Sequence, residues 1–163
     1  MKKSLIVVLA VLVAGIAGWF AWHPAPAAPD VAFSTLDGKT IKMADLRGKV
    51  VLVKFWATDC ITCNKQMPDT IADYQHYQPK GYVTMAVAMS YDPPNYVQNY
   101  SQTRHLPFPV ALDTQGKLAR AFGDVRLTPT AFLIDKQGRI VKRYLGEYDP
   151  AEFHAAIEKA LAG

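Results

Sequence analysis

The sequence has only two cysteines among its 163 residues, and they stand three positions apart as Cys60 and Cys63. A structural zinc site takes about four Cys or His ligands, but this chain offers no second cysteine pair and only four scattered histidines. A haem-attachment motif has histidine directly after its second cysteine, where this chain has Asn64. The scarcity of cysteine therefore argues against both zinc and covalently attached haem.

Runs and stripes of basic residues are also absent. The formal net charge is +4, and Lys2 and Lys3 at the extreme N-terminus supply two of these charges. Elsewhere the two signs are interleaved, so nothing predicts nucleic acid as a partner. The chain has no internal repeat and no low-complexity segment. Because 50% of its residues are hydrophobic and 20% are charged, we expect an ordinary globular protein, and a monomer.

One long hydrophobic run is present, from Leu5 to Trp22, and it carries no charge. It is longer than the roughly 7–15 residues of a secretory core and suits the roughly 17–25 residues of a spanning helix. A retained anchor in the inner membrane is therefore favoured over a cleaved signal peptide, although Ala25-Pro26-Ala27 offers a cleavage site. Either way, the positively charged start stays in the cytoplasm and the remainder is exported.

A Pro/Ala-rich stretch follows this run and predicts a semi-extended tether. We therefore divide the chain into residues 1–29, an anchor or signal peptide plus tether, and residues 30–163, a folded domain. The predicted strands are residues 32–36, residues 40–43, the apolar run from Lys49 and residues 82–90. Three further strands are predicted, a short one within FPVAL and one each in TAFLID and RIVKRYL. The predicted helices run from Cys60 to about Tyr77 with a kink at Pro68, from about Asn95, over 117–122 and from Pro150. This order predicts an α/β fold with a mixed sheet, helices on both faces and a leading N-terminal hairpin.

The cysteine pair follows a buried strand and opens a helix. At the helix N-terminus, unpaired N–H groups and the helix dipole favour Cys60 as a thiolate, the attacking species in disulfide exchange. Cys63 lies one turn later, faces inward and can resolve a mixed disulfide. An exported protein meets an oxidising compartment, where such a pair can cycle. A purely structural disulfide is the competing interpretation, but closing so short a loop removes little chain entropy.

These residues resemble a known family. The stretch VLVKFWATDCITCNKQMP is similar to the thioredoxin superfamily, and within it to the membrane-anchored, extracytoplasmic TlpA/ResA-type thiol–disulfide oxidoreductases. The anchor, the leading hairpin, the insert around residues 92–108 and LTPTAFLIDKQGRIVKRYLG extend the resemblance over most of the chain. It implies a thioredoxin-like, periplasmic enzyme whose redox-active Cys60–Cys63 disulfide works without a metal or another cofactor.

The resemblance also implies a direction and partners. Most members of the family reduce, for instance apocytochrome cysteines that await haem, so we expect net reduction of disulfides in exported proteins. Such a reductase would itself be re-reduced by a membrane electron donor. In thioredoxin-like folds the proline that matches Pro129 is cis, which leaves the backbone of Thr128 free to pair with a substrate strand.

Three positions depart from the family pattern. Many thioredoxins hold a buried acid where this chain has Lys54, and reducing members often carry Glu where it has Gln66. Asp59 precedes Cys60, at a position where an aromatic residue is common. Asp59 is therefore our candidate for the missing proton carrier, and Lys54, Gln66 and Trp56 are expected to modulate the couple.

Three placements stay open for Lys54. Its ammonium could snorkel to solvent, which is the favoured alternative. It could approach the sulfurs and stabilise a thiolate, or it could pair with Asp59 so that the two charges cancel.

Other functions could use the same scaffold. A peroxiredoxin-type peroxidase needs Pro-x-x-x-Thr-x-x-Cys, whereas Val53 and Ala57 stand at the proline and threonine positions. A copper-binding module could use the two thiolates, with His105 as a further candidate ligand. The segment YDPPNYVQNY could form a partner-binding surface, or Tyr91 and Tyr96 could pack as core beneath a loop.

Overall fold

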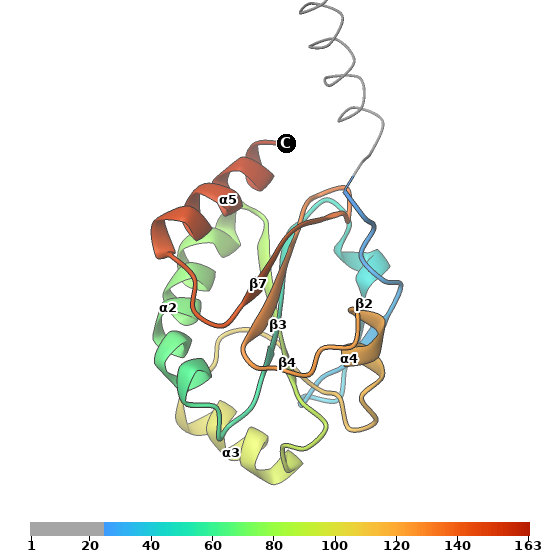
Figure 1. Cartoon of the computed structure of the whole chain (residues 1–163), viewed down its shortest axis with the longest axis vertical. Coiled ribbons are helices and arrows are strands. Elements are labelled where there is room, and N and C mark those ends of the chain that lie inside the picture. The colour runs from blue at the N-terminus through green and yellow to red at the C-terminus, as the bar shows by residue number, and fades with distance from the viewer. Residues whose placement is uncertain (1–24) are drawn as a thin grey trace, which may run out of the picture.

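A five-stranded mixed sheet forms the centre of the computed structural model, which describes residues 25–163 (Figure 1). The strands are β1 (Ala32–Ser34), β2 (Thr40–Lys42), β3 (Val50–Trp56), β4 (Tyr82–Ala88), β5 (Val110–Leu112), β6 (Thr130–Ile134) and β7 (Ile140–Leu145). The sheet order is β5-β4-β3-β6-β7, with β3 parallel to β4 and antiparallel to β6. β1 and β2 pair separately as the predicted N-terminal hairpin.

Helices cover both faces of this sheet. Within residues 25–163, the α-helices are α2 (Ile61–Tyr77), α3 (Pro94–Thr103), α4 (Lys117–Ala121) and α5 (Pro150–Ala162), and the 3-10 turns are η1 (Met43–Leu46) and η2 (Gln78–Lys80). In Figure 1, α2, α3 and α5 lie on one side of the sheet, and α4 lies with the hairpin on the other. The predicted α/β fold is therefore confirmed, and α2 continues through Pro68 without a break.

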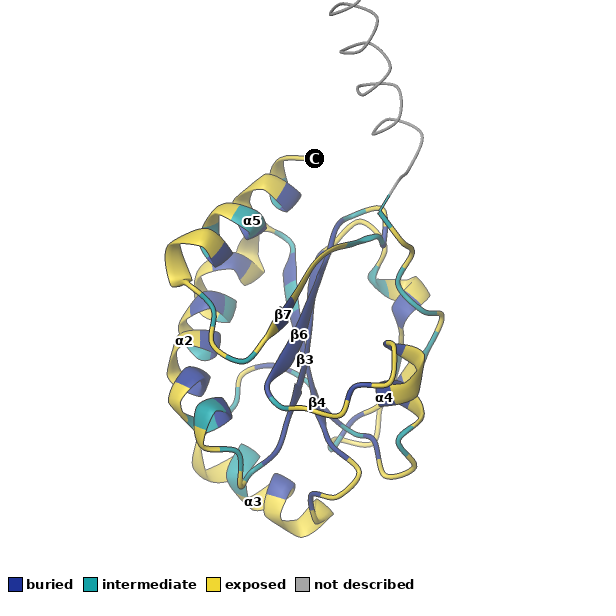
Figure 2. Ribbon diagram, in the orientation of Figure 1, coloured by how far each residue is buried: buried dark blue, intermediate teal, exposed yellow. Residues whose placement is uncertain are grey.

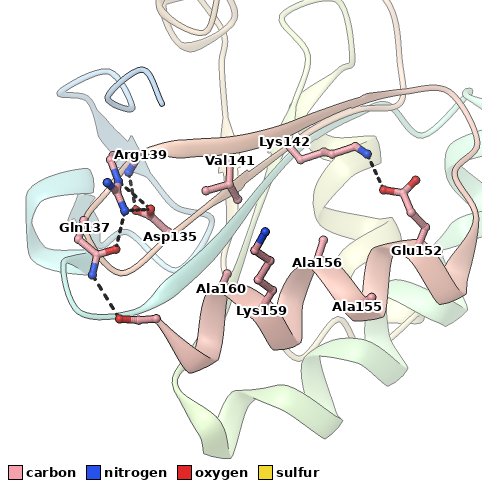
Figure 3. Close-up of a pocket in the computed structure, with 11 residues that line it drawn as sticks. Asp135, Gln137, Arg139, Val141, Lys142, Glu152, Ala155, Ala156, Lys159 and Ala160 are labelled. Atoms are coloured by element: carbon pink, nitrogen blue, oxygen red, sulfur yellow. Dashed lines mark hydrogen bonds and ion pairs between the residues drawn. The ribbon is translucent and has the colours of Figure 1, made fainter. Parts of the chain in front are cut away.

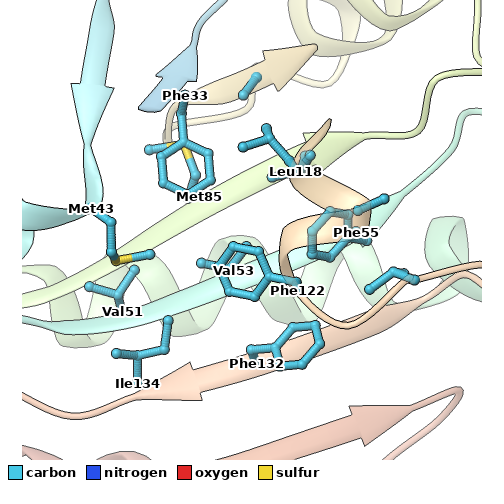
Figure 4. Packing of buried hydrophobic residues seen from close by; sticks show 14 of the residues in the cluster. Phe33, Met43, Val51, Val53, Phe55, Met85, Leu118, Phe122, Phe132 and Ile134 are labelled. Carbon is cyan, nitrogen blue, oxygen red and sulfur yellow. The ribbon is translucent and has the colours of Figure 1, made fainter. Parts of the chain in front are cut away.

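β3 is the central strand, and all seven of its residues are buried. Alternation places Phe55 on the face covered by α4, and its neighbours Lys54 and Trp56 on the face covered by α2. The Phe55 ring packs edge-on against Phe122 and Phe132, with centroids 5.5 and 6.1 Å away (Figure 4). Burial follows the sheet and the inner helix faces, while the outer helix faces are exposed (Figure 2). The strand that leads towards the cysteines is therefore buried along its whole length.

Residues 5–22, which we expect to anchor the chain, lie outside the described residues. Within residues 25–163, no helix combines the length and the apolar character needed to cross a membrane. The described part begins along the edge of the sheet, where the Pro26 carbonyl accepts the Ile140 N–H at 2.8 Å. The end of the Pro/Ala-rich stretch is therefore bound to the start of β7.

Candidate functional site

The two cysteines lie directly after β3, at the start of α2, and form a disulfide with an S–S distance of 2.10 Å. Cys60 is the N-cap of α2, and its Sγ accepts the backbone N–H of Cys63 at 3.1 Å. Cys63 is fully buried, whereas Cys60 is partly exposed. The sulfur that an incoming thiol or disulfide can reach is therefore that of Cys60.

A buried carboxylate holds the loop that leads into Cys60. Asp92, between β4 and α3, accepts the backbone N–H of Thr58 at 2.6 Å and its hydroxyl at 2.7 Å. Asn64 donates its side-chain amide to the Thr58 carbonyl at 2.9 Å. Thr58 is thus fixed through both backbone groups, two residues before the accessible cysteine. Sequence reasoning missed Asp92, because an acid in a Pro-bounded loop by itself predicts only a turn.

The Thr128–Pro129 peptide bond is cis and lies at the same edge of the sheet as the cysteines. The strand register places it there, because Thr130 opens β6 opposite Phe55, next to the end of β3. Pro129 is buried, and its carbonyl accepts the N–H of Gly146 at 2.8 Å. Thr128 is partly exposed, and within residues 25–163 its backbone N–H and C=O bond to no other residue. This edge therefore offers unpaired backbone groups beside the disulfide.

Exposed apolar side chains stand on each segment that meets at this edge. Ile61, between the cysteines, is 85% exposed, and Leu127, before Thr128, is 63% exposed. Tyr91 is 55% exposed, and its hydroxyl lies 3.3 Å from the Thr128 Oγ1, so the insert contacts the loop of the cis proline. Tyr96 is 60% exposed. These two tyrosines therefore form surface, and the alternative that they pack as core is wrong.

Lys54 is buried, with only 1% of its surface exposed. The favoured expectation that it snorkels to solvent is wrong, because β3 is the central strand and is covered on both faces. Its ammonium donates to Gln66 Oε1 at 3.0 Å and to Thr70 Oγ1 at 2.9 Å. Asp59 is exposed and is not among its partners, so the third alternative, a Lys54–Asp59 pair, is wrong as well. Two departures from the family pattern, Lys54 and Gln66, are direct hydrogen-bond partners.

Burial lowers the pKa of Lys54 from 10.5 to about 8, because the charged ammonium loses its hydration. The carboxylates of Asp73 and Asp69 act in the opposite direction and favour the charged form. The Tyr148 ring lies beneath the ammonium, 5.6 Å from Nζ to the ring centroid. The folded protein therefore holds the proton of Lys54 less tightly than the unfolded chain does.

Replacing Lys54 with methionine is expected to raise the free energy of unfolding at neutral pH by about 2–3 kcal/mol. The wild-type penalty is full below about pH 8 and disappears as pH rises towards 10.5, because the unfolded chain binds more protons in that window. The advantage of the variant should therefore shrink over the same range. Urea denaturation of both proteins at a series of pH values measures this difference, and a difference independent of pH would contradict the assignment.

A cavity of about 200 Å³ adjoins this cluster at the seam between α2 and α5, and Gln66, Asp69, Tyr148 and His154 contribute to its lining. Asp73 also lines it, and its Oδ1 lies 2.7 Å from His154 Nε2. Burial raises the pKa of Asp73, and the hydrogen bond with His154 partly opposes this rise. The titratable side chains of Asp69, Asp73 and His154 therefore line the cavity that adjoins the Lys54 cluster.

Trp56 and Asp59, the two remaining predicted residues, differ in burial. Trp56 is fully buried at the end of β3, and its ring packs 5.0 Å from that of Tyr100. It belongs to the same packed cluster as Cys63, and its Nε1 has no partner within the described residues. Asp59 is exposed, directly before Cys60. Trp56 thus supports the buried sulfur, and Asp59 stands at the solvent side.

A larger cavity, of about 510 Å³, lies between β7 and α5 (Figure 3). Val141 lines it, and the ion pairs Asp135–Arg139 and Lys142–Glu152 stand at its rim. None of its lining residues belongs to the cysteine loop or to the loop of the cis proline. Among residues 25–163, no cluster of three or more His, Cys, Asp or Glu side chains could hold a metal ion.

Known proteins share this architecture. The Redoxin family model matches residues 24–161. The thiol-disulfide oxidoreductase ResA of Bacillus thuringiensis is 35% identical over 133 residues, which cover 81% of this chain and 75% of the relative. ResA of Bacillus subtilis is 34% identical over 127 residues, which cover 78% of this chain and 70% of the relative.

Solved structures agree with these relatives. A putative thioredoxin from Neisseria meningitidis superposes with a TM-score of 0.80 at 36% identity and covers 86% of this chain and 93% of its own. A putative thiol:disulfide interchange protein DsbE from Chlorobium tepidum superposes with a TM-score of 0.76 at 29% identity. The superposition covers 85% of this chain and 98% of that protein.

Proposed function

The chain belongs to the Redoxin family and is a thiol–disulfide oxidoreductase of the ResA type, and from this premise we propose that it reduces disulfides in exported proteins. One observation carries the proposal. An accessible Cys60 and a buried Cys63 share a helix N-terminus beside the unpaired backbone of Thr128. This geometry supports covalent exchange with an extended substrate segment that pairs with Thr128 next to the cis Pro129.

The reaction proceeds in two exchanges. The Cys60 thiolate attacks a substrate disulfide, so that a Cys60–substrate bond forms and one substrate sulfur leaves. The Cys63 thiolate then attacks Cys60, the internal disulfide forms, and the second substrate sulfur leaves and takes a proton from solvent. Two electrons have then passed from the cysteine couple to the substrate. A membrane electron donor returns them, and residues 5–22 hold the enzyme beside that donor on the periplasmic side of the inner membrane.

The direction of transfer is tested by the reduction potential of the Cys60–Cys63 couple, measured by equilibration in defined thiol–disulfide buffers. We expect a value of about −250 mV or below, in the range of reductants such as thioredoxin. A value near −120 mV, typical of a strong oxidant, would overturn the reducing role while leaving the exchange chemistry intact.

Asp59 is proposed to carry protons between Cys60 and solvent. The support is its exposed position directly before the accessible cysteine. An Asp59→Asn variant is expected to exchange disulfides more slowly and with an altered pH profile, because the amide can neither take nor release the proton. Stopped-flow exchange rates across the pH range measure this effect, and a profile and rate identical to those of the wild type would remove the assignment.

A further inference from the structure

Lys54 is an energetically unfavourable residue at its position in the fold. Its side chain is buried, and its two hydrogen-bond partners, Gln66 and Thr70, carry no charge. On the neighbouring strands it stands opposite Ala86 and Ala131, so neither register partner offers a balancing carboxylate. A buried cation without a hydrogen-bonded anion lowers stability. Such groups are characteristic of functional sites when they lie beside reactive atoms.

Cys63 lies on the same side of α2 as Gln66, a direct hydrogen-bond partner of Lys54. Gln66, which accepts the Lys54 hydrogen bond, follows Cys63 by three residues on α2, so their side chains share one helix face. Trp56 follows Lys54 by two residues on β3, points to the same face, and belongs to the packed cluster of Cys63. The ammonium therefore lies below the buried sulfur, roughly one to two helical turns (about 5–10 Å) away.

Other ionisable side chains lie on the same face of the sheet as Lys54. The ionisable groups on this face include Asp69, Asp73 and Tyr77 of α2, His154 of α5, Tyr148 before α5, Tyr82 of β4 and Tyr144 of β7. The two carboxylates lie further along α2 than Gln66, and Asp73 is bonded to His154. Along α2, Cys63 precedes both hydrogen-bond partners of the cation, Asp69 lies between these partners, and Asp73 follows them.

We propose that Lys54 is a positioning residue for the second exchange, where its ammonium, held by Gln66 and Thr70, stabilises the Cys63 thiolate. The inference rests on the proposed function for its reaction. In this step the Cys63 thiol gives its proton to solvent, and the thiolate attacks the Cys60 Sγ. The Cys60–Cys63 bond forms, the Cys60–substrate bond breaks, and the leaving substrate sulfur takes a proton. Lys54 keeps its own proton throughout and supplies only charge.

The coupling is reciprocal, because a thiolate that is stabilised by an ammonium also stabilises that ammonium. The oxidised protein holds no thiolate, and in that form the pKa of Lys54 is about 8. Reduction should therefore raise the titration midpoint of Lys54. A lysine that merely fills space would titrate identically in the two redox states.

The test mixes reduced full-length protein with the small disulfide 5,5′-dithiobis(2-nitrobenzoate) in a stopped-flow instrument. The first released thiolate reports attack by Cys60, and the second reports resolution by Cys63. In Lys54→Met the second phase should slow about tenfold at neutral pH, and its pH midpoint should rise by about one unit. The first phase should change much less. Lys54→Arg keeps the cation and should restore the second phase.

The matched control is Lys65→Met, which removes an exposed lysine from the same helix, where it pairs with Glu147 at 2.9 Å. Both phases should stay at wild-type rates. A second phase of Lys54→Met that matches the wild type at every pH would overturn the proposal, and so would equal slowing of both phases.

A second measurement needs no substitution. Carbon-13 resonances of the Lys54 Cε should titrate about one pH unit higher in the reduced protein than in the oxidised protein, and equal midpoints would overturn the proposal. Neither measurement uses a protein substrate. Failure of the proposed function would appear separately, as absent exchange with protein disulfides while both phases and both midpoints keep the expected values.

Discussion

A Cys63→Ala variant is expected to accumulate as a stoichiometric covalent adduct with its substrate protein, and turnover should be lost. Cys60 remains accessible at the helix N-terminus, so the first exchange proceeds. The resolving sulfur is missing, and Cys63 is the only other cysteine in the chain, so nothing within the protein can release the substrate. Non-reducing electrophoresis and mass spectrometry of the adduct measure this outcome.

The matched control is Cys60→Ala. It leaves the fully buried Cys63 as the one thiol, and we expect no adduct because that sulfur is out of reach of a protein disulfide. An adduct of Cys60→Ala would reverse the assigned roles. Continued turnover by Cys63→Ala would show that the pair does not act as an internal couple.

Much of this site was predictable because it depends on features that are local in sequence. An apolar strand followed at once by a cysteine pair places Cys60 where the helix begins, and the structure has the helix starting at Ile61. The hairpin, the buried strands and the Asp149–Pro150 start of α5 also follow from local patterns. Among the elements of residues 25–163, the sequence did not predict the two 3-10 turns, η1 and η2, or the terminal residues of several helices and strands.

The environment of Lys54 could not be read from sequence because it depends on the order of the strands. A lysine in an apolar run reaches solvent from an edge strand, but β3 is central and both of its faces are covered. Its contact with Gln66 joins a strand to a helix, and no local pattern encodes that distance. The bond from Asp92 to Thr58 spans 34 positions and is hidden for the same reason. Sequence thus located the reactive sulfurs and named Lys54 and Gln66, but it gave neither the contact between these two residues nor the role of Asp92.

A Phe55→Ala variant is expected to lose about 3–5 kcal/mol of unfolding free energy, a large part of the roughly 5–15 kcal/mol that holds a domain of this size together. Phe55 is fully buried in the central strand, and its ring packs against Phe122 and Phe132. Removing the ring leaves a cavity that the surrounding strands cannot close. Urea denaturation of the oxidised protein, with the disulfide intact in both forms, measures the change.

Val141→Ala is the matched control, because Val141 is also an apolar strand residue but is 42% exposed on β7. The Val141→Ala variant should lose no more than about 0.5–1 kcal/mol of unfolding free energy. Equal losses for the two variants would contradict the placement of the core on β3. Phe55 also stands opposite Thr130, directly after the cis proline, so we expect Phe55→Ala to slow disulfide exchange as well as to lower stability. Phe55→Leu partly refills the cavity and separates these two effects. Recovered stability with exchange still slower than in the wild type would show that the ring also sets the geometry of the edge where the substrate pairs.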